Sequence, residues 1–512
     1  MNSPDKTAHR SPRGYTGSER WVLAATILGS SLAFIDGSVV NVALPALQRG
    51  LGATAADLQW VIEAYALFFS ALLLVGGALG DHFGRRRVYA VGILLFAAAS
   101  TWCGFAGSVR ALVVARAIQG VGAALLVPGS LALIAASFPG SSRGRAIGTW
   151  SGMSAMTTAF GPVLGGWLID HFSWRWAFFL NLPIAAVVLL LLFWRVPESL
   201  DATAPRQLDW PGAALATLGL GGIVYGLIES SPRGWHHPAV VLPLIAGAAC
   251  LAAFVVVEAR SRAPMLPLTL FRSRSFTGAN LLTVGVYGAL SMILFALPMN
   301  LIQVQGYSAT AAGAATLPFI LILVLLSRWS GGLLDRVGAR LPLVVGPVIV
   351  AGGYAMLART GVGGSYWTTF FPAMIALGIG MAGTVAPLTT TVMNAVEVSH
   401  SGIASGVNNA MSRTAGLIAI ALMSVILLHV FQIQMEKRLN ESRVRPVIAA
   451  QVRAQRMMLG AVAAPASATP SERAAIQHAV AEAFVAGFRS VAWIAAGLAL
   501  TSAALAAWLI DR

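Results

Sequence analysis

Four charged residues stand inside long apolar stretches of the sequence: Asp36, Glu63, Arg116 and Arg413. A charged side chain at the depth of a lipid bilayer costs at least about 2.5–3.5 kcal/mol on insertion scales, so each needs a partner or a role. A carboxylate beside a buried cation keeps its charge, whereas one that loses this cation in a drier environment tends to bind a proton. These residue types therefore predict proton uptake and release within a membrane.

The apolar stretches have to position these residues. Hydrophobic types make up 57% of the 512 residues and charged types only 10%, whereas soluble domains carry about 25% charged residues. A helix needs roughly 20 apolar residues to cross a bilayer, and fourteen such stretches lie between Trp21 and Ile510. We therefore predict an all-α integral membrane protein with fourteen transmembrane helices.

The rise of 1.5 Å per helical residue gives each charge an approximate depth. Asp36 lies about 24 Å along the first helix, and Glu63 and Arg116 lie about 8 Å into helices that start from the opposite face. The three residues thus share one level of the N-terminal half, which predicts a proton-coupling group. Arg116 would tune the carboxylates, since guanidinium groups do not deprotonate in proteins. The alternative is a static ion pair that holds helices together.

Arg413 lies near mid-membrane, about 16 Å into its helix. The helices of the C-terminal half carry no embedded Asp or Glu. Arg413 could therefore meet an anionic or hydrogen-bond-accepting substrate, or it could bond backbone carbonyls at a helix break near Gly416.

The distribution of basic residues predicts orientation. The formal net charge is +15, but the basic residues fall in short loops and form no contiguous face, so we expect no nucleic-acid partner. Loops on the side of the N-terminal tail hold most of them, which predicts a multi-pass protein of the plasma (inner) membrane with both termini cytoplasmic. The long connection 429–485 then lies outside; we expect it to contain a surface helix and a flexible segment at 463–471.

One sequence pattern occurs twice. Gly77, Asp81, Gly84 and the arginines Arg85 and Arg86 follow the second helix, and Gly331, Asp335, Gly338 and Arg340 follow the tenth. Duplicated halves produce such a pattern, although two ordinary glycine-rich turns would also do so. The repeat predicts a cytoplasmic tail 1–19, a six-helix bundle 20–195, a linker with two extra helices 196–274, and a second six-helix bundle 275–512 that includes the loop 429–485.

Several motifs, in order along nearly the whole chain, resemble the major facilitator superfamily, specifically its fourteen-spanner drug:proton antiporter branch (EmrB/QacA type). The loop from Gly77 to Arg87 is similar to the superfamily's loop between helices two and three, and Phe34–Pro45 is similar to the branch's first-helix motif. The other motifs are Arg116, Gln119 and Gly120 in helix four, Gly161, Pro162, Gly165 and Gly166 in helix five, Trp174–Ile184, Gln303–Pro318 and Ala386–Arg413.

The resemblance implies the major facilitator fold, two six-helix bundles plus two extra helices. It also implies a proton-coupled antiporter that exports hydrophobic or amphipathic drugs or antibiotics by alternating access; a dedicated exporter of one endogenous metabolite is the alternative. The loop Gly77, Asp81, Gly84, Arg85 and Arg86 would act as a conformational switch, and Gly161, Pro162, Gly165 and Gly166 as the antiporter motif. Possible substrate contacts are Gln119, Asn300, Gln303, Asn409 and Arg413.

The sequence contains no phosphate-binding loop, no metal-spaced His/Cys cluster and no nucleophile elbow. We therefore expect no enzymatic activity and no cofactor, with energy drawn from a proton gradient. The expected partners are small amphipathic substrates, protons and the lipid bilayer. Whether a periplasmic adaptor protein takes part stays open.

Overall fold

A computed structural model describes residues 17–138, 140–200, 209–261, 264, 266–331, 337–397, 401–442 and 444–510. Within these residues the protein is all-helical. Thirteen helices there are long and apolar enough to cross a membrane, and α5 (Gly140–His171) adds one more of sufficient length. The structure thus agrees with the prediction of fourteen transmembrane helices.

The remaining spans are formed by single helices or by short helices in line. They are α1 (Gly17–Leu51), α2 (Ala55–Phe83), α3 (Arg85–Phe105), α4 (Val109–Ser137), α6 (Trp176–Phe179) with α7 (Asn181–Arg195), α8 (Trp210–Arg233), α9 (Pro238–Arg260), α10 (Arg274–Met299) with η2 (Asn300–Val304), α11 (Ala309–Ala314) with α12 (Leu317–Gly331), α14 (Arg340–Leu357), α15 (Tyr366–Thr369) with α16 (Phe371–Asn394), α17 (Ser401–Glu441) and α19 (Pro470–Leu509).

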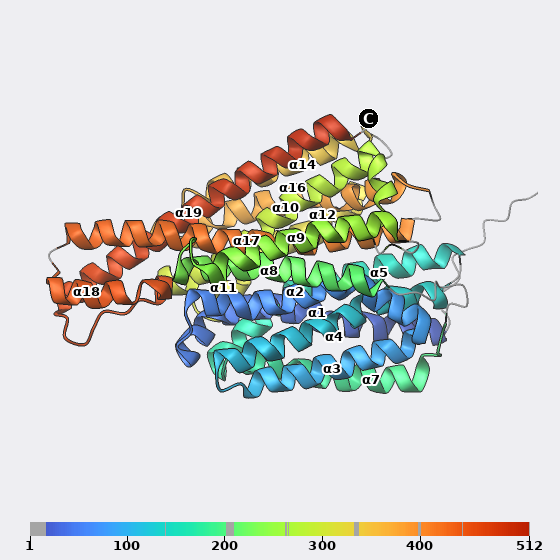
Figure 1. Cartoon of the computed structure of the whole chain (residues 1–512), viewed down its shortest axis with the longest axis horizontal. Helices are drawn as coiled ribbons and strands as arrows, with labels where there is room; N and C mark the ends of the chain where they lie inside the picture. The colour runs from blue at the N-terminus through green and yellow to red at the C-terminus, as the bar shows by residue number, and fades with distance from the viewer. Residues whose placement is uncertain are drawn as a thin grey trace, which may run out of the picture.

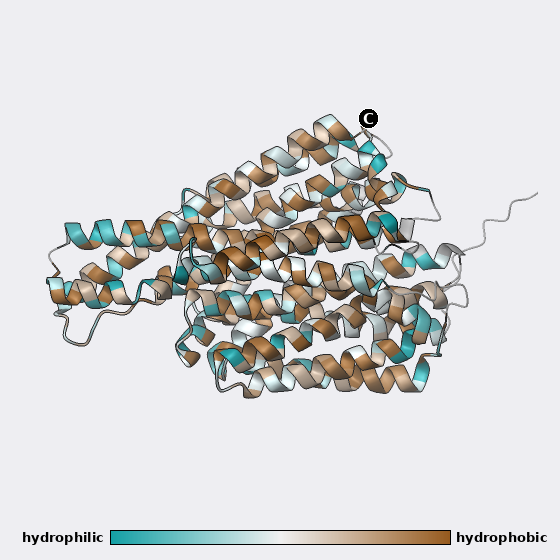
Figure 2. Ribbon diagram, in the orientation of Figure 1, coloured by the Kyte–Doolittle hydropathy of each residue, from teal (hydrophilic) through white to brown (hydrophobic). Residues whose placement is uncertain are grey.

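The outer surface of the helices is apolar. Helix α9 has the most hydrophobic window of the thirteen and yet only 11% of that window is buried within the protein. Leu242 and Ile245 on α9 are 64% and 63% exposed. Polar residues instead gather toward the two ends of the molecule (Figure 2). This arrangement is stable only if lipid covers the middle of the helices.

The helices form two groups that follow the order of the sequence (Figure 1). In the first group α2 and α3 pack on α4, and α1 packs on α5. In the second group α10 packs on α17 and α19, and α16 packs on α12 and α14. Helices α8 and α9 pack on each other, and α8 also contacts α2 and α17, so it bridges the two groups.

A helical hairpin extends beyond the rest of the molecule (left in Figure 1). It consists of the last turns of α17, the first turns of α19, and between them α18 (Pro446–Ala454) and the 3-10 turn η4 (Arg456–Ala461). The surface helix expected in the loop 429–485 is therefore present, in part as a continuation of α17. The segment expected to be flexible makes hydrogen bonds: Arg445 donates to the carbonyl of Ser467 at 2.8 Å and Arg473 to that of Ala466 at 2.9 Å. We call this end of the molecule the hairpin end and the opposite one the tail end.

Candidate functional site

Asp36 and Arg116 form an ion pair inside the first helix group. Asp36 on α1 is 0% exposed and Arg116 on α4 is 1% exposed, and Arg116 Nη1 donates directly to Asp36 Oδ2. The Arg116 Nε also donates to the carbonyl of Val61 on α2 at 3.0 Å. Gly120 lets α4 approach that helix, because a Cβ there would clash with the carbonyl of Tyr65. The depths estimated from the sequence thus correctly paired Asp36 with Arg116.

Neutral polar side chains complete the surroundings of Asp36. Gln119 lies one turn after Arg116 on the same face of α4; it donates to Asp36 Oδ1 at 2.8 Å and accepts from Arg116 at 2.6 Å. Asn181 at the start of α7 donates to the same Oδ1 at 3.2 Å, and both amides also donate to the hydroxyl of Ser100 on α3. Because the donors of Gln119 are occupied, it positions Asp36 in this conformation and has none left for a substrate.

Two aromatic rings on α2 connect this pair to Arg413 in the second helix group. The Arg116 guanidinium lies 4.3 Å from the ring centroid of Tyr65, and Tyr65 lies 5.6 Å from Phe69, one turn further along α2. Arg413 on α17 lies 3.8 Å from the ring centroid of Phe69. Cation–π contacts at such distances are attractive. The buried Arg116 and the partly exposed Arg413 thus lie at opposite ends of one aromatic pair.

Arg413 makes no hydrogen bond and no ion pair with any residue that the structure describes. Helix α17 runs without a break through Gly416, so the helix break near Gly416 considered from the sequence is absent. The donors of the Arg413 guanidinium are left for a ligand or water. Asn409, one turn earlier on α17, is exposed, and among the described residues its side chain donates to the carbonyl of Ser405, at 3.4 Å.

Glu63 on α2 is separate from the Asp36–Arg116 pair. It is 0% exposed, and neither carboxylate oxygen has a hydrogen-bond partner among the described residues. The sequence placed Glu63 about 8 Å into its helix, at the level of Asp36 and Arg116, but this shared depth does not bring it into contact with either residue.

The four residues of the antiporter motif serve two interfaces of α5. Gly161 and Gly165 face α1, where a Cβ on Gly165 would lie 2.9 Å from Val39 Cγ2. Pro162 and Gly166 face α11 in the other group. A Cβ on Gly166 would lie 2.6 Å from the carbonyl carbon of Ala309 on α11. A Cβ on Gly313, also on α11, would lie 2.5 Å from the carbonyl carbon of Pro162. The motif therefore permits backbone-to-backbone contact between the two groups.

Polar contacts reinforce this interface at the hairpin end. Asp170 at the end of α5 accepts from the backbone NH groups of Ala309 and Thr310, at 3.0 and 2.8 Å, and so caps α11. Gln48 on α1 accepts from Gln303 Nε2 at 2.8 Å and donates to the carbonyl of Met458 in η4 at 3.0 Å. The two helix groups and the hairpin are thus connected at this end of the molecule.

Asn300 lies in the same region, in the π-helical turn η2. It is 0% exposed and accepts from Gln305 at 3.2 Å, while its Nδ2 has no partner among the described residues. Of the five possible substrate contacts, Asn300 and Gln303 therefore lie together in η2 toward the hairpin end, and Gln119 belongs to the Asp36 cluster. Asn409 and Arg413 lie together on α17.

The loop after α2 is held within the first helix group. Asp81 pairs with Arg85 at 2.8 Å, and the backbone NH of Arg86 donates to Glu198, beyond α7, at 2.9 Å. Gly84 has a φ of +106°, which favours glycine. In the second copy Gly338 has a φ of +75°, which supports the internal repeat, while Asp335 lies outside the described residues. Gly77 faces Pro128 on α4.

Sequence reasoning missed Ser100, Asn181, Tyr65 and Glu198 as partners of the predicted residues. Ser100 and Asn181 are polar residues within apolar stretches, a signal that could have placed them near a buried charge. Nothing in the sequence separates Tyr65 from the other aromatic residues of the spans. The contact of Glu198 with Arg86 depends on how the end of α7 meets the start of α3.

Comparisons with known proteins agree with this architecture. The family model described as Major Facilitator Superfamily matches residues 26–420. The multidrug resistance protein Stp of Mycobacterium tuberculosis (strain CDC 1551 / Oshkosh) is 35% identical over 83% of this chain and 79% of its own. The tetracenomycin C resistance and export protein of Streptomyces glaucescens is 30% identical, and the match covers 99% of this chain and 94% of that protein. The puromycin resistance protein pur8 of Streptomyces alboniger is 38% identical, and the match covers 79% of this chain and 81% of that protein.

Solved structures show the same fold at low sequence identity. The crystal structure of a bacterial homolog to the human lysosomal transporter Spinster has a TM-score of 0.64 and 17% identity, and the match covers 98% of this chain and 100% of that one. The inward-open xylose transporter XylE from E. coli has a TM-score of 0.57 and 16% identity over 96% of each chain.

Proposed function

Because the chain belongs to the Major Facilitator Superfamily, we propose that it is a proton-coupled antiporter that exports hydrophobic or amphipathic drugs or antibiotics by alternating access. The buried Asp36–Arg116 pair carries this proposal. Apolar side chains of similar size would hold these helices together without the free-energy cost of removing two charges from water. A role in proton coupling would explain why this protein has a buried ion pair at this place. The relatives named for multidrug resistance and for antibiotic resistance or export support the class of substrate.

The proposal includes an orientation and a division of the chain. The plasma membrane would hold the protein with the hairpin end outside and both termini in the cytoplasm, as the distribution of basic residues predicts. Bundles 20–195 and 275–512 would move relative to each other, with 196–274 between them. The contacts of α5 with α11 would close the outer side in the conformation described here.

Coupling would follow from the charge state of Asp36. While ionised, Asp36 holds Arg116, Gln119 and Asn181 in one arrangement. Binding of a proton removes the attraction to Arg116, so the arrangement of helices α1, α4 and α7 loses part of its stabilisation. Two conformations that differ in affinity for this proton are sufficient to couple export to the gradient.

Arg413 suggests which substrates bind. Its guanidinium lies over the ring of Phe69 and makes no hydrogen bond with the described residues, so it fits a neutral or weakly acidic amphipath that offers a hydrogen-bond acceptor. We expect Arg413→Gln to lower resistance to weakly acidic compounds more than resistance to dicationic biocides. Arg413→Lys should keep only part of the resistance to weakly acidic compounds, because lysine retains the charge but lacks the planar guanidinium with its paired donors. The measurement is growth inhibition by each compound in an efflux-deficient host that expresses the parent or a variant. If the parent protein gives its strongest resistance against dicationic compounds, the proposed substrate class is wrong.

The decisive test of the function uses purified protein in vesicles loaded with a pH-sensitive dye. Adding substrate should move protons in the direction opposite to the substrate, and a protonophore should abolish uphill transport. Absence of substrate-dependent proton movement, with transport intact, would exclude proton coupling. Protection against one compound alone in the growth panel would instead favour the alternative, a dedicated exporter of one endogenous metabolite.

A further inference from the structure

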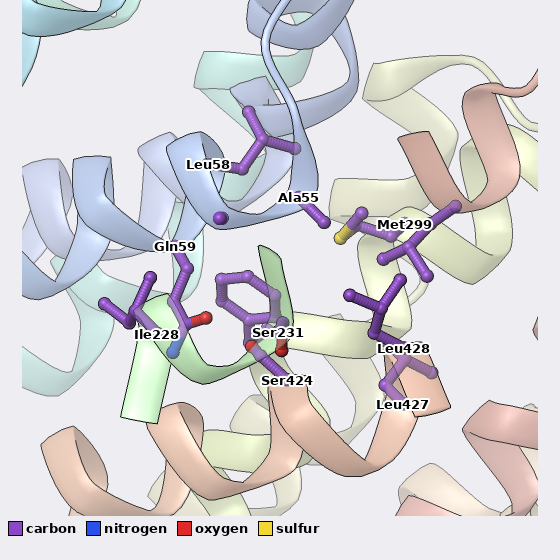
Figure 3. Close-up of a pocket in the computed structure, with 12 residues that line it drawn as sticks. Ala55, Leu58, Gln59, Ile228, Ser231, Met299, Ser424, Leu427 and Leu428 are labelled. Carbon is purple, nitrogen blue, oxygen red and sulfur yellow. The ribbon is translucent and has the colours of Figure 1, made fainter. Parts of the chain in front are cut away.

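A small pocket lies at the hairpin end, where both helix groups meet α8 (Figure 3). Its walls come from α2, α8, α10 and α17, and Leu459 of η4 contributes from the hairpin. Ala55 in the first turn of α2 also lines it, which places the pocket near the end of the bundle. The walls are mostly apolar, and the free space suits a water molecule better than a drug-sized substrate.

Three polar side chains line one side of this pocket: Gln59, Ser231 and Ser424 (Figure 3). Gln59 is 2% exposed, and its Nε2 has no hydrogen-bond partner among the described residues. A buried amide without a partner is unfavourable, and buried polar groups of this kind are usually satisfied by ordered water. Water in the pocket would satisfy Gln59, and the two serine hydroxyls could hold it.

Glu63 follows Gln59 by four residues on α2, so the two side chains lie on the same face, one turn apart. Both Glu63 oxygens are buried and have no hydrogen-bond partner in the part of the chain that the structure describes, and an ionised carboxylate in that state is strongly disfavoured. The elements packed against α2 carry many charged or titratable groups, among them Asp36, Arg116, Tyr225, Glu229, Arg413 and Arg456. None of these groups pairs with Glu63 in the described part of the chain.

We propose that Glu63 is a second proton-binding carboxylate, separate from the Asp36–Arg116 pair, and that the pocket at Gln59 is its access route from the hairpin end. A hydronium ion in the pocket would transfer its proton to the Glu63 carboxylate, leaving a neutral water molecule. Gln59 is a positioning residue that holds the water and carries no proton itself. The inference rests on the proposed function, because it requires protons to be taken up from outside.

The test measures the number of protons exchanged per molecule of a neutral substrate, from the reversal potential of transport in vesicles. Glu63→Gln keeps the shape of an already unpartnered side chain, so the protein should fold and should exchange one proton fewer than the parent. Gln59→Leu should keep the stoichiometry of the parent but slow proton uptake from the hairpin side by roughly tenfold. Gln59→Ser retains a polar group and leaves room for water, so it should keep most of the rate.

The outcomes separate this inference from the proposed function. A parent that moves no protons with substrate refutes the function itself. If the parent is coupled and Glu63→Gln exchanges as many protons as the parent, Glu63 binds no transported proton and the inference is wrong. If Gln59→Leu takes up protons as fast as the parent, the pocket is not the access route. Unfolding temperatures of all variants show whether a change in rate reflects misfolding.

Discussion

Uphill export should fail when Asp36 is replaced by Asn. The amide has nearly the shape of the carboxylate but cannot exchange a proton, so the two conformations no longer differ in proton affinity at this site. Downhill exchange of substrate should survive, because Asp36 is buried and already bonded to Arg116, Gln119 and Asn181, so the proposal assigns it no contact with the substrate. Vesicles loaded with a pH-sensitive dye should show fewer protons moved per molecule of substrate than in the parent, because only the proton carried by Glu63 remains.

The same change should also destabilise the protein. Arg116 would remain buried without its carboxylate, and removing one partner of a buried ion pair typically costs about 3–5 kcal/mol. The unfolding temperature and the yield of folded protein must therefore be measured with transport. Asp57→Asn is the matched control, because Asp57 is the third residue of the capping box of α2 and accepts from the backbone NH of Thr54, which an amide oxygen can also do. If Asp36→Asn moves protons as well as the parent, the Asp36–Arg116 pair is only structural.

Gly166→Val should prevent α5 from closing on α11. A Cβ at Gly166 would lie 2.6 Å from the carbonyl carbon of Ala309 and 2.7 Å from Thr310 Cα. These are backbone atoms, which cannot move aside by a change of rotamer. The clash lies between the two helix groups, so each group can still fold while the contact opens. We expect transport to fall by about a hundredfold, since displacements near 1 Å can have that effect.

A cysteine reporter can detect the opening directly. Ala309 is 6% exposed in the closed contact, so an Ala309→Cys thiol should react slowly in the parent and faster in Gly166→Val. Cys250 is half-buried and is replaced by Ser, whereas the buried Cys103 can stay. Gly152→Val, on the same helix, is the control because nothing lies within 4 Å of its Cβ position. Equal labelling of Ala309→Cys in both backgrounds, together with normal transport, would contradict the assigned role of Gly166.

The sequence alone determined the class of the protein and its helices. Long apolar runs have one stable arrangement in a bilayer, in which each helix satisfies its own backbone, so composition and length predicted the spans. Helix α5 shows where hydropathy is weakest: its Gly, Ser and Thr residues lower the signal, and only its length and neighbours identify it as a span. The motif glycines were also visible, because close helix contact requires small residues at those positions.

Depth was likewise available from the sequence, since each residue adds a fixed rise along a helix. That estimate brought Asp36 and Arg116 to one level, and the structure pairs them. It could not tell which way each side chain points around its helix axis. The rotation of a helix depends on which neighbours it packs against, and these neighbours come from distant parts of the chain.

Tertiary structure therefore decided what each buried polar residue does. Glu63 shares the depth of Asp36 but lies on the face of α2 with Gln59, and its carboxylate has no partner among the residues that the structure places. Gln119 is occupied by Asp36 and Ser100, and Arg413 stacks on Phe69 from the other helix group. Each of these contacts joins residues of different helices, and only the packing of side chains from several helices at once fixes such distances.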